Sequence, residues 1–260
     1  MTLLAIDIGN SHTVLGIFRE EILIGEWRVS TFPILSMKAL EVHIKLFCCE
    51  VGIRPGEIDG AGIASVVPDS THVFRKVLQR KFSIKPLVIT RKNVTGLGIR
   101  YGKGDTLGAD RICNAVAAYA RYGGPVVVID FGTATTYDVV LRNGTYVGGI
   151  IFPGIETLAN ALHHFTAQLP VPPLIFPKSI TGTGTTECLQ SGIMYGTTDA
   201  MEGLLRRLKK VIHGRAKIVA TGGFAGLLAP HIPSIDRVDH ALVLEGIRLI
   251  QRKAGRKRRN

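Results

Sequence analysis

The sequence predicts an α/β fold with mixed sheets, organised as two similar halves. The main observation is an internal repeat, in which residues 3–18 align with residues 126–141 so that Asp, Gly and Thr coincide. A second observation is that apolar runs typical of strands alternate with helical patterns in both halves. A third is the length of 260 residues, which suffices for two domains of about 130 residues, each with its own core.

Each copy of the repeat has the pattern of a β-hairpin. A buried apolar run ends in Asp-x-Gly, a short polar turn follows, and a second apolar run comes next. A third apolar run lies at residues 22–29 in the first half and at residues 145–152 in the second half. Each half is therefore expected to open with a three-stranded meander.

Helices and further strands follow each meander. The apolar spacing predicts helices over residues 36–51, 69–81, 107–122, 154–165, 186–212 and 239–252, and strands over residues 60–67, 86–90 and 217–220. Gly123, Gly124 and Pro125 end the helix that joins the halves. We therefore expect domains at residues 1–122 and 123–251, followed by a basic tail at residues 252–260. The proline-rich residues 169–179 suggest an extended crossing or a lid.

The net charge of +12 is concentrated at one end of the chain, because six basic residues lie among residues 252–260. A solvated, frayed terminus is the favoured interpretation, and contact of the tail with RNA, anionic lipid or an acidic partner is the alternative. The remaining positive charge suits small anionic substrates.

Other composition features point to a cytoplasmic protein. No apolar run reaches the roughly 18 residues of a membrane span, and no basic leader precedes the first strand. The four cysteines contain no Cys-x-x-Cys pair, so we interpret them as ordinary buried thiols; they are Cys48, Cys49, Cys113 and Cys188.

The turn after the first repeated strand has the residues of a phosphate site. Asp7 is followed by Gly9, which lets the backbone approach a ligand, and by Ser11 and Thr13, whose hydroxyls can donate to phosphoryl oxygens. Asp7 can hold the magnesium ion that accompanies the phosphates. An ordinary hairpin turn would look the same, and this alternative has about equal weight for the first copy alone.

The second copy offers a similar turn, in which Asp130 is followed by Gly132, Thr133, Thr135 and Thr136. Two such turns, expected on opposite sides of one nucleotide cleft, could position and neutralise phosphates during phosphoryl transfer. The motifs Gly-x4-Gly-Lys-Ser/Thr and Gly-x-Gly-x-x-Gly after a strand are absent from the sequence. The sequence therefore favours an ATP-dependent kinase of a small molecule.

The segment from Gly108 to Arg111 opens the joining helix and pairs opposite charges. Asp110 could accept a proton from a substrate hydroxyl, and Arg111 could bind a carboxylate or phosphate near the helix N-terminus. A capping aspartate beside an exposed arginine is the alternative, and the spacing alone slightly favours it. Residues 181–186 and 221–223 could add ligand contacts, although such glycine-rich turns also occur without a ligand.

Five motifs, taken in order, resemble those of the type III pantothenate kinases. They are the Asp-x-Gly-Asn opening, Gly-x-Asp-Arg at residues 108–111, Asp-x-Gly-Thr-Ala-Thr-Thr at residues 130–136, Gly-Gly-x-Ile-x-Pro-Gly at residues 148–154 and Thr-Gly-Gly at residues 221–223. The resemblance extends to about Gln251, and the motifs are specific together although each is weak alone. It implies the acetate and sugar kinase, heat-shock chaperone and actin superfamily, and so a duplicated ribonuclease-H-like fold with a nucleotide cleft.

The resemblance implies a pantothenate kinase, which uses ATP to phosphorylate the primary hydroxyl of pantothenate in the first step of coenzyme A biosynthesis. It also implies a homodimer activated by a monovalent cation, K⁺ or NH₄⁺, with ATP and Mg²⁺ as cofactors. By resemblance, Asp110 would accept the hydroxyl proton, and Asp130 would bind the monovalent cation. The implied ATP contacts are Asp7, Ile8, Gly9, Asn10, Ser11, His12, Thr13, Val14 and Thr133, with Asp7 also a metal ligand. The implied substrate contacts are Tyr101, Gly108, Ala109, Arg111 and Thr185.

The chain departs from the family pattern after Tyr101, where residues 102–106 read Gly-Lys-Gly-Asp-Thr in place of the usual Asn-Pro turn. The resemblance therefore does not extend to the shape of the substrate pocket at this point. Two other functions also stay open: a kinase for another small metabolite, such as acetate or a sugar, and a transcriptional accessory factor that contacts nucleic acid through its tail. The presence of Asp7, Asp110 and Asp130 argues against an inactive enzyme. Nucleic acid and membranes are therefore not expected as partners.

Overall fold

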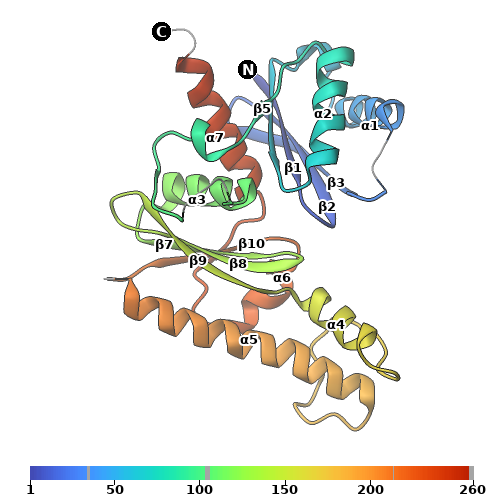
Figure 1. The fold of residues 1–260 in the computed structure, drawn as a ribbon, viewed down its shortest axis with the longest axis vertical. Helices are drawn as coiled ribbons and strands as arrows, with labels where there is room; N and C mark the ends of the chain where they lie inside the picture. Colours follow the sequence, from blue (N-terminus) through green and yellow to red (C-terminus); the bar gives the residue numbers. More distant parts are fainter. Residues whose placement is uncertain (34–35, 103–105, 213, 258–260) are drawn as a thin grey trace. The chain divides into compact units, whose positions relative to one another are not determined.

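The computed structural model describes residues 1–33, 36–102, 106–212 and 214–257 (Figure 1). The chain forms two compact units. Met1–Arg121 and Ala241–Asn260 make up the first unit, and Tyr122–His240 make up the second. Each unit contains strands of one mixed sheet together with helices, which confirms the predicted α/β class.

The first unit has a five-stranded sheet in the order β3-β2-β1-β4-β5. Its strands are β1 (Thr2–Ile8), β2 (His12–Arg19), β3 (Ile22–Ser30), β4 (Gly60–Ser65) and β5 (Leu87–Val88). The first three are antiparallel neighbours, as the predicted meander requires, whereas β4 is parallel to β1 and β5 is parallel to β4. A short strand, β6 (Gly98–Ile99), follows later in the same unit.

The strands of the second unit follow the order β11-β10-β7-β8-β9. They are β7 (Val126–Phe131), β8 (Ala134–Val140), β9 (Thr145–Pro153), β10 (Lys217–Thr221) and β11 (Arg237–Val238). Strands β7, β8 and β9 form the antiparallel meander, and β10 and β11 continue parallel to β7 on its other side. The order and directions match the first sheet, so the duplication extends from the hairpin to all five strands.

The two meanders share a register shift. The pairing of β2 with β3 shifts after Ile17, and the pairing of β8 with β9 shifts after Val139. Each shift begins three residues beyond the partner of the aspartate, because Val14 pairs with Asp7 and Thr136 pairs with Asp130. Since bulges bend and twist a strand locally, the two meanders have the same irregularity at the same place.

The two polar turns differ in length by one residue. Four residues, 9–12, lie between the last pair of β1 and β2, Ile8 and Thr13, whereas three, 132–134, lie between the last pair of β7 and β8, Phe131 and Thr135. Thr13 is therefore the structural counterpart of Thr135, and not of Thr136 as in the ungapped alignment of the repeats. Thr13 and Thr135 are both buried beside their turns, at 2% and 1% exposure.

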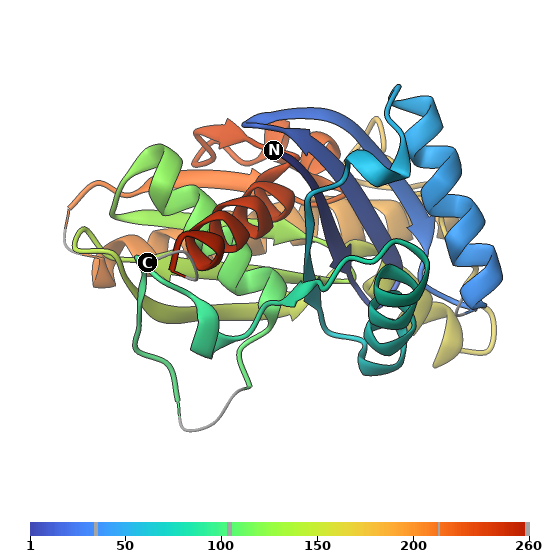
Figure 2. The ribbon, with the colours of Figure 1, turned by 90° about the horizontal axis from the view of Figure 1, so that it is seen from above.

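One face of the first sheet packs against α1 (Met37–Glu50) and α2 (Pro68–Lys81), which lie together beside the strands in Figure 2. Their apolar side chains share a core with Leu4, Ile6 and Ile8 of β1. Because successive residues of a strand point to opposite faces, Asp7 points to the other face. That face packs against α7 (Leu242–Lys257), which in turn contacts α3 (Ala109–Tyr122).

Glycines let α7 approach this face closely. A Cβ atom on Gly16 would lie 2.7 Å from a Leu244 methyl carbon, and one on Gly62 would lie 2.5 Å from an Ile247 methyl carbon. Gly246 has no room for a side chain either, because the backbone of Cys113 in α3 lies against it. These contacts fix α3 through α7 to the sheet that carries Asp7.

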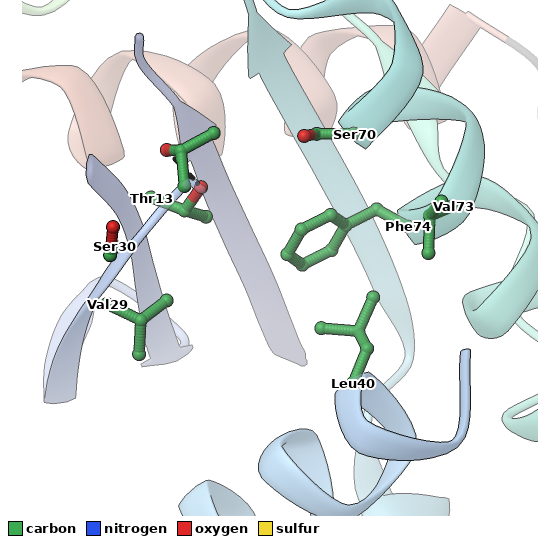
Figure 3. Close-up of a pocket in the computed structure, with 8 residues that line it drawn as sticks. Thr13, Val29, Ser30, Leu40, Ser70, Val73 and Phe74 are labelled. Carbon is green, nitrogen blue, oxygen red and sulfur yellow. Dashed lines mark hydrogen bonds between the residues drawn. The ribbon is translucent and has the colours of Figure 1, made fainter. Parts of the chain in front are cut away.

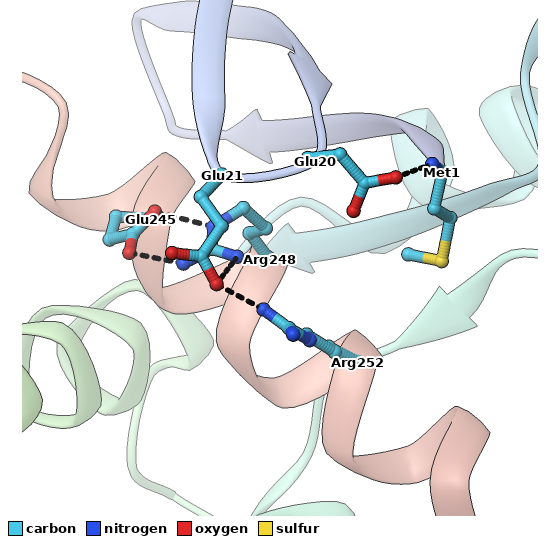
Figure 4. A network of polar contacts seen from close by, with 6 residues as sticks. All are labelled: Met1, Glu20, Glu21, Glu245, Arg248 and Arg252. Atoms are coloured by element: carbon cyan, nitrogen blue, oxygen red, sulfur yellow. Dashed lines mark hydrogen bonds and ion pairs between the residues drawn. The ribbon is translucent and has the colours of Figure 1, made fainter.

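Charged residues also tie α7 to the first unit (Figure 4). Arg248, only 4% exposed, donates two hydrogen bonds of 2.7 Å to Glu245 in the preceding turn of the helix. Arg252 donates to Glu21 between β2 and β3, and this hydrogen bond is the main reason why the pKa of Glu21 is lowered. The buried part of this network contributes more to stability than the exposed Arg252 pair, which solvent screens.

This position of α7 changes two predictions. The tail was expected to be frayed from residue 252, but α7 continues to Lys257 because Arg252 and Lys253 both have partners. Residues 258–260 lie outside the described part of the chain. The helix also belongs to the first unit, whereas the sequence analysis assigned residues up to 251 to the second half.

The second unit has helices α4 (Ile155–His164), α5 (Thr185–Val211) and α6 (Ala225–Leu228). Its core joins Val127, Ile129 and Phe131 of β7 to α5 residues such as Met194 and Leu205. Short 3-10 helices complete both units: η1 (Pro55–Glu57), η2 (Arg91–Asn93) and η3 (Ala229–His231).

The proline-rich residues 169–179 lie along α5 without forming a helix or a strand. Gln190 donates a hydrogen bond of 3.0 Å to the Pro173 carbonyl, and Tyr195 donates one of 3.0 Å to the Pro177 carbonyl. The segment is irregular, and α5 side chains satisfy its carbonyls.

The cysteines differ in exposure. Cys48 and Cys113 are buried, as predicted, but Cys49 and Cys188 are exposed. Cys49 faces solvent because consecutive helical residues are turned by about 100° from each other, so Cys49 cannot share the buried direction of Cys48. Within the described ranges, no helix has the length and hydropathy needed to cross a bilayer.

Candidate functional site

The first polar turn places Asp7 at the end of β1 and exposes the loop that follows. The Gly9 amide donates to the His12 carbonyl at 3.0 Å and closes the loop. Asn10 and His12 are exposed, whereas Thr13, the first residue after the loop, is buried. The exposed part of the turn can therefore meet a ligand while Thr13 anchors it.

Thr31 supports this turn and was missed by the sequence analysis. It is 4% exposed, its amide donates to the Ser11 carbonyl at 3.0 Å, and its hydroxyl donates to the Gly9 carbonyl at 2.8 Å. The same hydroxyl lies 2.9 Å from the Thr13 hydroxyl. Thr31 follows β3 in the sequence, and only the folding of β3 beside β2 brings it to the turn, so no local pattern could have revealed it.

A small pocket lies behind the turn (Figure 3). It is lined by Thr13 and Thr31 on the strand side and by Leu40, Ser70 and Phe74 on the helix side. Ser70 is 3% exposed, and its hydroxyl has no hydrogen-bond partner among the described residues. The pocket is therefore apolar except for hydroxyl groups beside the turn.

The charges of Asp7 and Asp110 both act on Cys113 of α3. Burial raises the pKa of the Cys113 thiol well above its usual value, and the charges of Asp7 and Asp110 raise it further. Asp110 lies one helical turn before Cys113 on the same side of α3. The two carboxylates that the sequence analysis singled out in the first half are thus brought together in one unit.

Asp110 is held in place at the first turn of α3. Its carboxylate accepts a 2.8 Å hydrogen bond from the Arg111 amide. A Cβ atom on Gly108 would collide with the same carboxylate, so a larger residue there would have to displace the Asp110 side chain. Burial raises the pKa of Asp110 above its ordinary value, although the Arg111 amide and charge act in the opposite direction. A raised pKa makes the carboxylate a stronger base.

Arg111 is buried at 6% exposure, which contradicts the exposed arginine of the capping alternative. Its guanidinium lies 6.0 Å from the centre of the Tyr101 ring, at the outer limit of a cation–π contact. The structure thus brings together three of the predicted substrate residues in one unit: Tyr101, Gly108 and Arg111. Residues 103–105 of the unusual turn after Tyr101 lie outside the described chain.

The second polar turn has a different support. The Thr133 carbonyl accepts hydrogen bonds from the Gly154 amide at 3.1 Å and from the Thr157 hydroxyl at 2.6 Å. A side chain on Gly154 would collide with the carbonyls of Gly132 and Thr133. The Gly-Gly-x-Ile-x-Pro-Gly motif therefore ends in a glycine that the turn requires.

Asp130 lies beside the late Thr-Gly-Gly motif. Asp130 and Thr221 are paired in the parallel strands β7 and β10. Gly222 follows with φ of +91°, and a Cβ atom on it would collide with the Asp130 carboxylate. Only glycine both adopts this backbone and leaves the carboxylate its space.

Thr185 is the first residue of α5 and is exposed. Just before it, the amide and the hydroxyl of Thr183 donate to Glu187 at 2.8 and 2.9 Å. These hydrogen bonds, the one from the Thr183 amide first, lower the pKa of Glu187. The Glu187 carboxylate, in the first turn of α5, thus fixes the glycine-rich residues that precede the helix.

The described residues contain no group of three or more His, Cys, Asp or Glu that could hold a metal alone. This donor set fits Mg²⁺ bound together with a nucleotide, since Mg²⁺ then takes one or two carboxylates, phosphate oxygens and water. Asp7, at the end of a strand and before a glycine turn, is a suitable carboxylate.

The comparisons with known proteins fit this geometry. Residues 3–207 match the family model described as type III pantothenate kinase. A type III pantothenate kinase from Moorella thermoacetica is 42% identical over 248 residues, which cover 95% of this chain and 98% of the relative. The chain belongs to the type III pantothenate kinase family. The resemblance inferred from the five motifs is thus confirmed, and the other kinases and the transcriptional accessory factor are not favoured.

Solved structures confirm the fold class. A Campylobacter jejuni protein, described as a candidate Baf family transcriptional activator, aligns with a TM-score of 0.60 at 19% identity, covering 97% of this chain and 99% of that one. An inorganic polyphosphate/ATP-glucomannokinase from Arthrobacter sp. strain KM aligns with a TM-score of 0.50 at 13% identity, covering 98% and 99%. At these identities the likeness concerns the fold alone. Members of the type III pantothenate kinase family thus share a fold with a sugar kinase.

Proposed function

We propose that the protein transfers the terminal phosphoryl group of ATP to the primary hydroxyl of pantothenate, giving 4'-phosphopantothenate for coenzyme A biosynthesis. The observation that carries this proposal is the cluster of Asp7, Asp110 and Arg111 in one unit of a type III pantothenate kinase family member. A carboxylate base, a cation for the substrate and a second carboxylate for the phosphate side are the groups that the reaction needs.

Asp110 is the catalytic base in this proposal. Its pKa is raised by burial, so the carboxylate accepts the hydroxyl proton more readily than an ordinary aspartate. Since the transition state of phosphoryl transfer is loose, the nucleophile loses its proton late, and the position of the carboxylate matters more than its basicity. The close fit of Gly108 and the hydrogen bond from the Arg111 amide supply that position.

Arg111 binds the carboxylate of pantothenate, and Tyr101, Gly108, Ala109 and Thr185 complete the substrate contacts. A buried guanidinium favours an anionic partner because its own desolvation is offset only by a charge or by hydrogen bonds. The proximity of the Tyr101 ring supports a pocket that is part apolar and part cationic. Such a pocket suits a small carboxylate with an aliphatic chain.

The first turn, residues 7–14, binds the ATP phosphates, with Mg²⁺ held by Asp7, and Thr133 adds a nucleotide contact. Magnesium supplies charge neutralisation at the phosphate oxygens. Asp130 holds the monovalent cation, K⁺ or NH₄⁺, beside Gly222. The turn amides and the hydroxyls of Ser11 and Thr13 orient the phosphates.

We further infer a cytoplasmic homodimer. The second unit exposes large apolar side chains, including Phe165 at 83% and Ile180 at 67%, which are the kind of surface that a second copy would cover. ATP and a soluble vitamin as substrates favour the cytoplasm. Sedimentation of the purified protein at several concentrations measures the oligomeric state.

The decisive test measures ADP release with pantothenate, acetate and several sugars, each in sodium or in potassium buffer. We expect turnover with pantothenate only, and a higher rate with potassium. Turnover with another acceptor and none with pantothenate would reject the proposed substrate. Equal rates in sodium and potassium would reject the monovalent cation.

Asp110→Asn tests the base. Turnover is expected to fall by about two to four decades. Because burial raises the folded-state pKa of Asp110, this group costs stability once the pH rises above the ordinary carboxylate range, so Asp110→Asn is expected to unfold at a higher temperature near neutral pH. A near-normal rate would reject Asp110 as base, and a lower unfolding temperature would contradict the cost of burying its charge.

A further inference from the structure

Arg91 contacts the backbone around Tyr101. One terminal nitrogen of its guanidinium donates to the Ile99 carbonyl at 3.0 Å, and the other donates to the Tyr101 carbonyl at 3.2 Å and to the Gly102 carbonyl at a longer 3.5 Å. Arg91 thus contacts three carbonyls in one short segment. None of the sequence motifs includes this residue.

β6 ends at Ile99, and residues 100–102 form neither a helix nor a strand. Backbone outside regular structure loses its conformational freedom only through other contacts. A rigid guanidinium that donates to several carbonyls removes this freedom more effectively than a single flexible donor.

Arg91 is itself anchored. The Thr90 amide donates to the Asn93 side chain at 3.0 Å, and the Asn93 amide donates back to the Thr90 carbonyl at 3.1 Å, closing the turn of η2 around Arg91. The Asn93 side chain also donates to the Val88 carbonyl of β5 at 2.7 Å. The guanidinium therefore projects from a turn that is fixed to the edge of the first sheet.

We propose that Arg91 is a positioning residue for pantothenate binding. It acts by holding the Tyr101 backbone so that the ring lies near Arg111 among the proposed substrate contacts. This inference rests on the proposed function. The chain of contacts runs from β5 through Asn93 and Arg91 to Tyr101, and from Tyr101 to Arg111 beside the catalytic base.

The first experiment compares Arg91→Ala with Arg100→Ala in steady-state kinetics of pantothenate phosphorylation. Arg100 is exposed on the same segment, so its removal changes the charge equally without removing the carbonyl contacts. We expect Arg91→Ala to raise the KM for pantothenate about tenfold or more, which corresponds to about 1.4 kcal/mol, while kcat and the KM for ATP change less than about twofold. Arg100→Ala should leave all three unchanged.

Arg91→Lys serves as the conservative variant and as a safeguard if Arg91→Ala folds poorly. A lysine can reach one or two carbonyls but cannot hold all three in one plane, so an intermediate KM for pantothenate is expected. Equal rises of the KM for ATP and for pantothenate, or a fall in kcat alone, would show a general structural role and overturn the inference.

A double-mutant cycle with Tyr101→Ala tests the route. If Arg91 acts through Tyr101, Arg91→Ala should have little further effect on the KM for pantothenate in the Tyr101→Ala background. If the two substitutions instead raise the KM for pantothenate by factors that multiply in the double mutant, Arg91 does not act through Tyr101. An active wild-type enzyme in which Arg91→Ala behaves like Arg100→Ala would refute the positioning role alone, whereas a wild type inactive on pantothenate would refute the proposed function and this inference with it.

Discussion

The two copies of the Asp-x-Gly turn share their strand order but not their support. The first turn has four residues between its last strand pairs and is held by the buried Thr31, whose hydroxyl donates to the Gly9 carbonyl and whose amide donates to the Ser11 carbonyl. The second has three loop residues and is held by the Gly154 amide and an exposed threonine at the start of α4. Duplication thus preserved the strands and the carboxylates, while the contacts around each turn diverged.

This difference suggests how one duplicated element can have two roles. The longer first turn leaves more exposed backbone for phosphates, and its hydroxyl support lies out of reach of solvent. The shorter second turn leaves Asp130 packed between its own loop and Gly222, which suits a small bare cation better than a polyphosphate. The following experiments test whether the two turns differ in function as they differ in contacts.

The largest effect is expected from the carboxylates themselves. Asp7→Asn should lower kcat/KM for ATP by about 100-fold or more, because it removes the charge that holds Mg²⁺ at the phosphates. Asp130→Asn should instead remove the preference for potassium over sodium and lower the rate by a smaller factor. Steady-state rates in the two salts measure both. Loss of the potassium preference in Asp7→Asn but not in Asp130→Asn would reverse the assignment.

A glycine pair tests the packing around Asp130. Gly222→Ala is expected to cost about 2–4 kcal/mol, because the alanine must adopt φ of +91° and push its Cβ atom into the Asp130 carboxylate. Gly132→Ala is the matched control, since its Cβ atom would meet nothing closer than 3.5 Å. Urea unfolding measures both changes. Similar costs for the two variants would mean that the space beside Asp130 is not constrained.

A threonine pair compares the two supports directly. Thr31→Val should cost about 1–3 kcal/mol, because it removes a buried donor and leaves the Gly9 carbonyl and the Thr13 hydroxyl with fewer partners. Thr157→Val, at an exposed site, should cost less than about 1 kcal/mol. The KM for ATP should rise in Thr31→Val and stay unchanged in Thr157→Val. An unchanged KM for ATP in both variants would show that the contacts of Thr31 with the first turn do not affect nucleotide binding.

The sequence predicted most of the fold because its signals are local. Strong apolar periodicity gave the long helices to within three residues at their starts, and Ser36 caps α1 as its sequence position suggests. Strand β11 and helix α6 are too short for periodicity to detect. Which sheet a terminal helix covers is decided by packing, so the sequence could not place α7 in the first unit.

The sequence predicted only those residues of the candidate site that lie in recognisable motifs. Asp7, Asp110 and Arg111 stand in recognisable patterns, and the structure brings them together. Thr31 and Arg91 make contacts with segments 8 or more residues away, and neither has a pattern of its own. The sequence also did not reveal the extra residue in the first turn, because an ungapped alignment of the repeats matches Thr13 with Thr136 instead of Thr135.

The smallest effect is expected at Ser70, in the pocket behind the first turn (Figure 3). If the pocket is dry, Ser70→Ala removes a buried hydroxyl that has no partner within the described residues, so unfolding free energy should stay within about 0.5 kcal/mol or increase. Ser65→Ala is the matched control, since the Ser65 hydroxyl accepts hydrogen bonds from the Val67 amide and the Thr71 hydroxyl, and its loss should cost about 1 kcal/mol. A cost at Ser70 equal to that at Ser65 would indicate a buried water that links α2 to the Thr13 and Thr31 hydroxyls. In that case Ser70→Ala should also raise the KM for ATP, because the first turn would then depend on the helix side of the pocket as well as on Thr31.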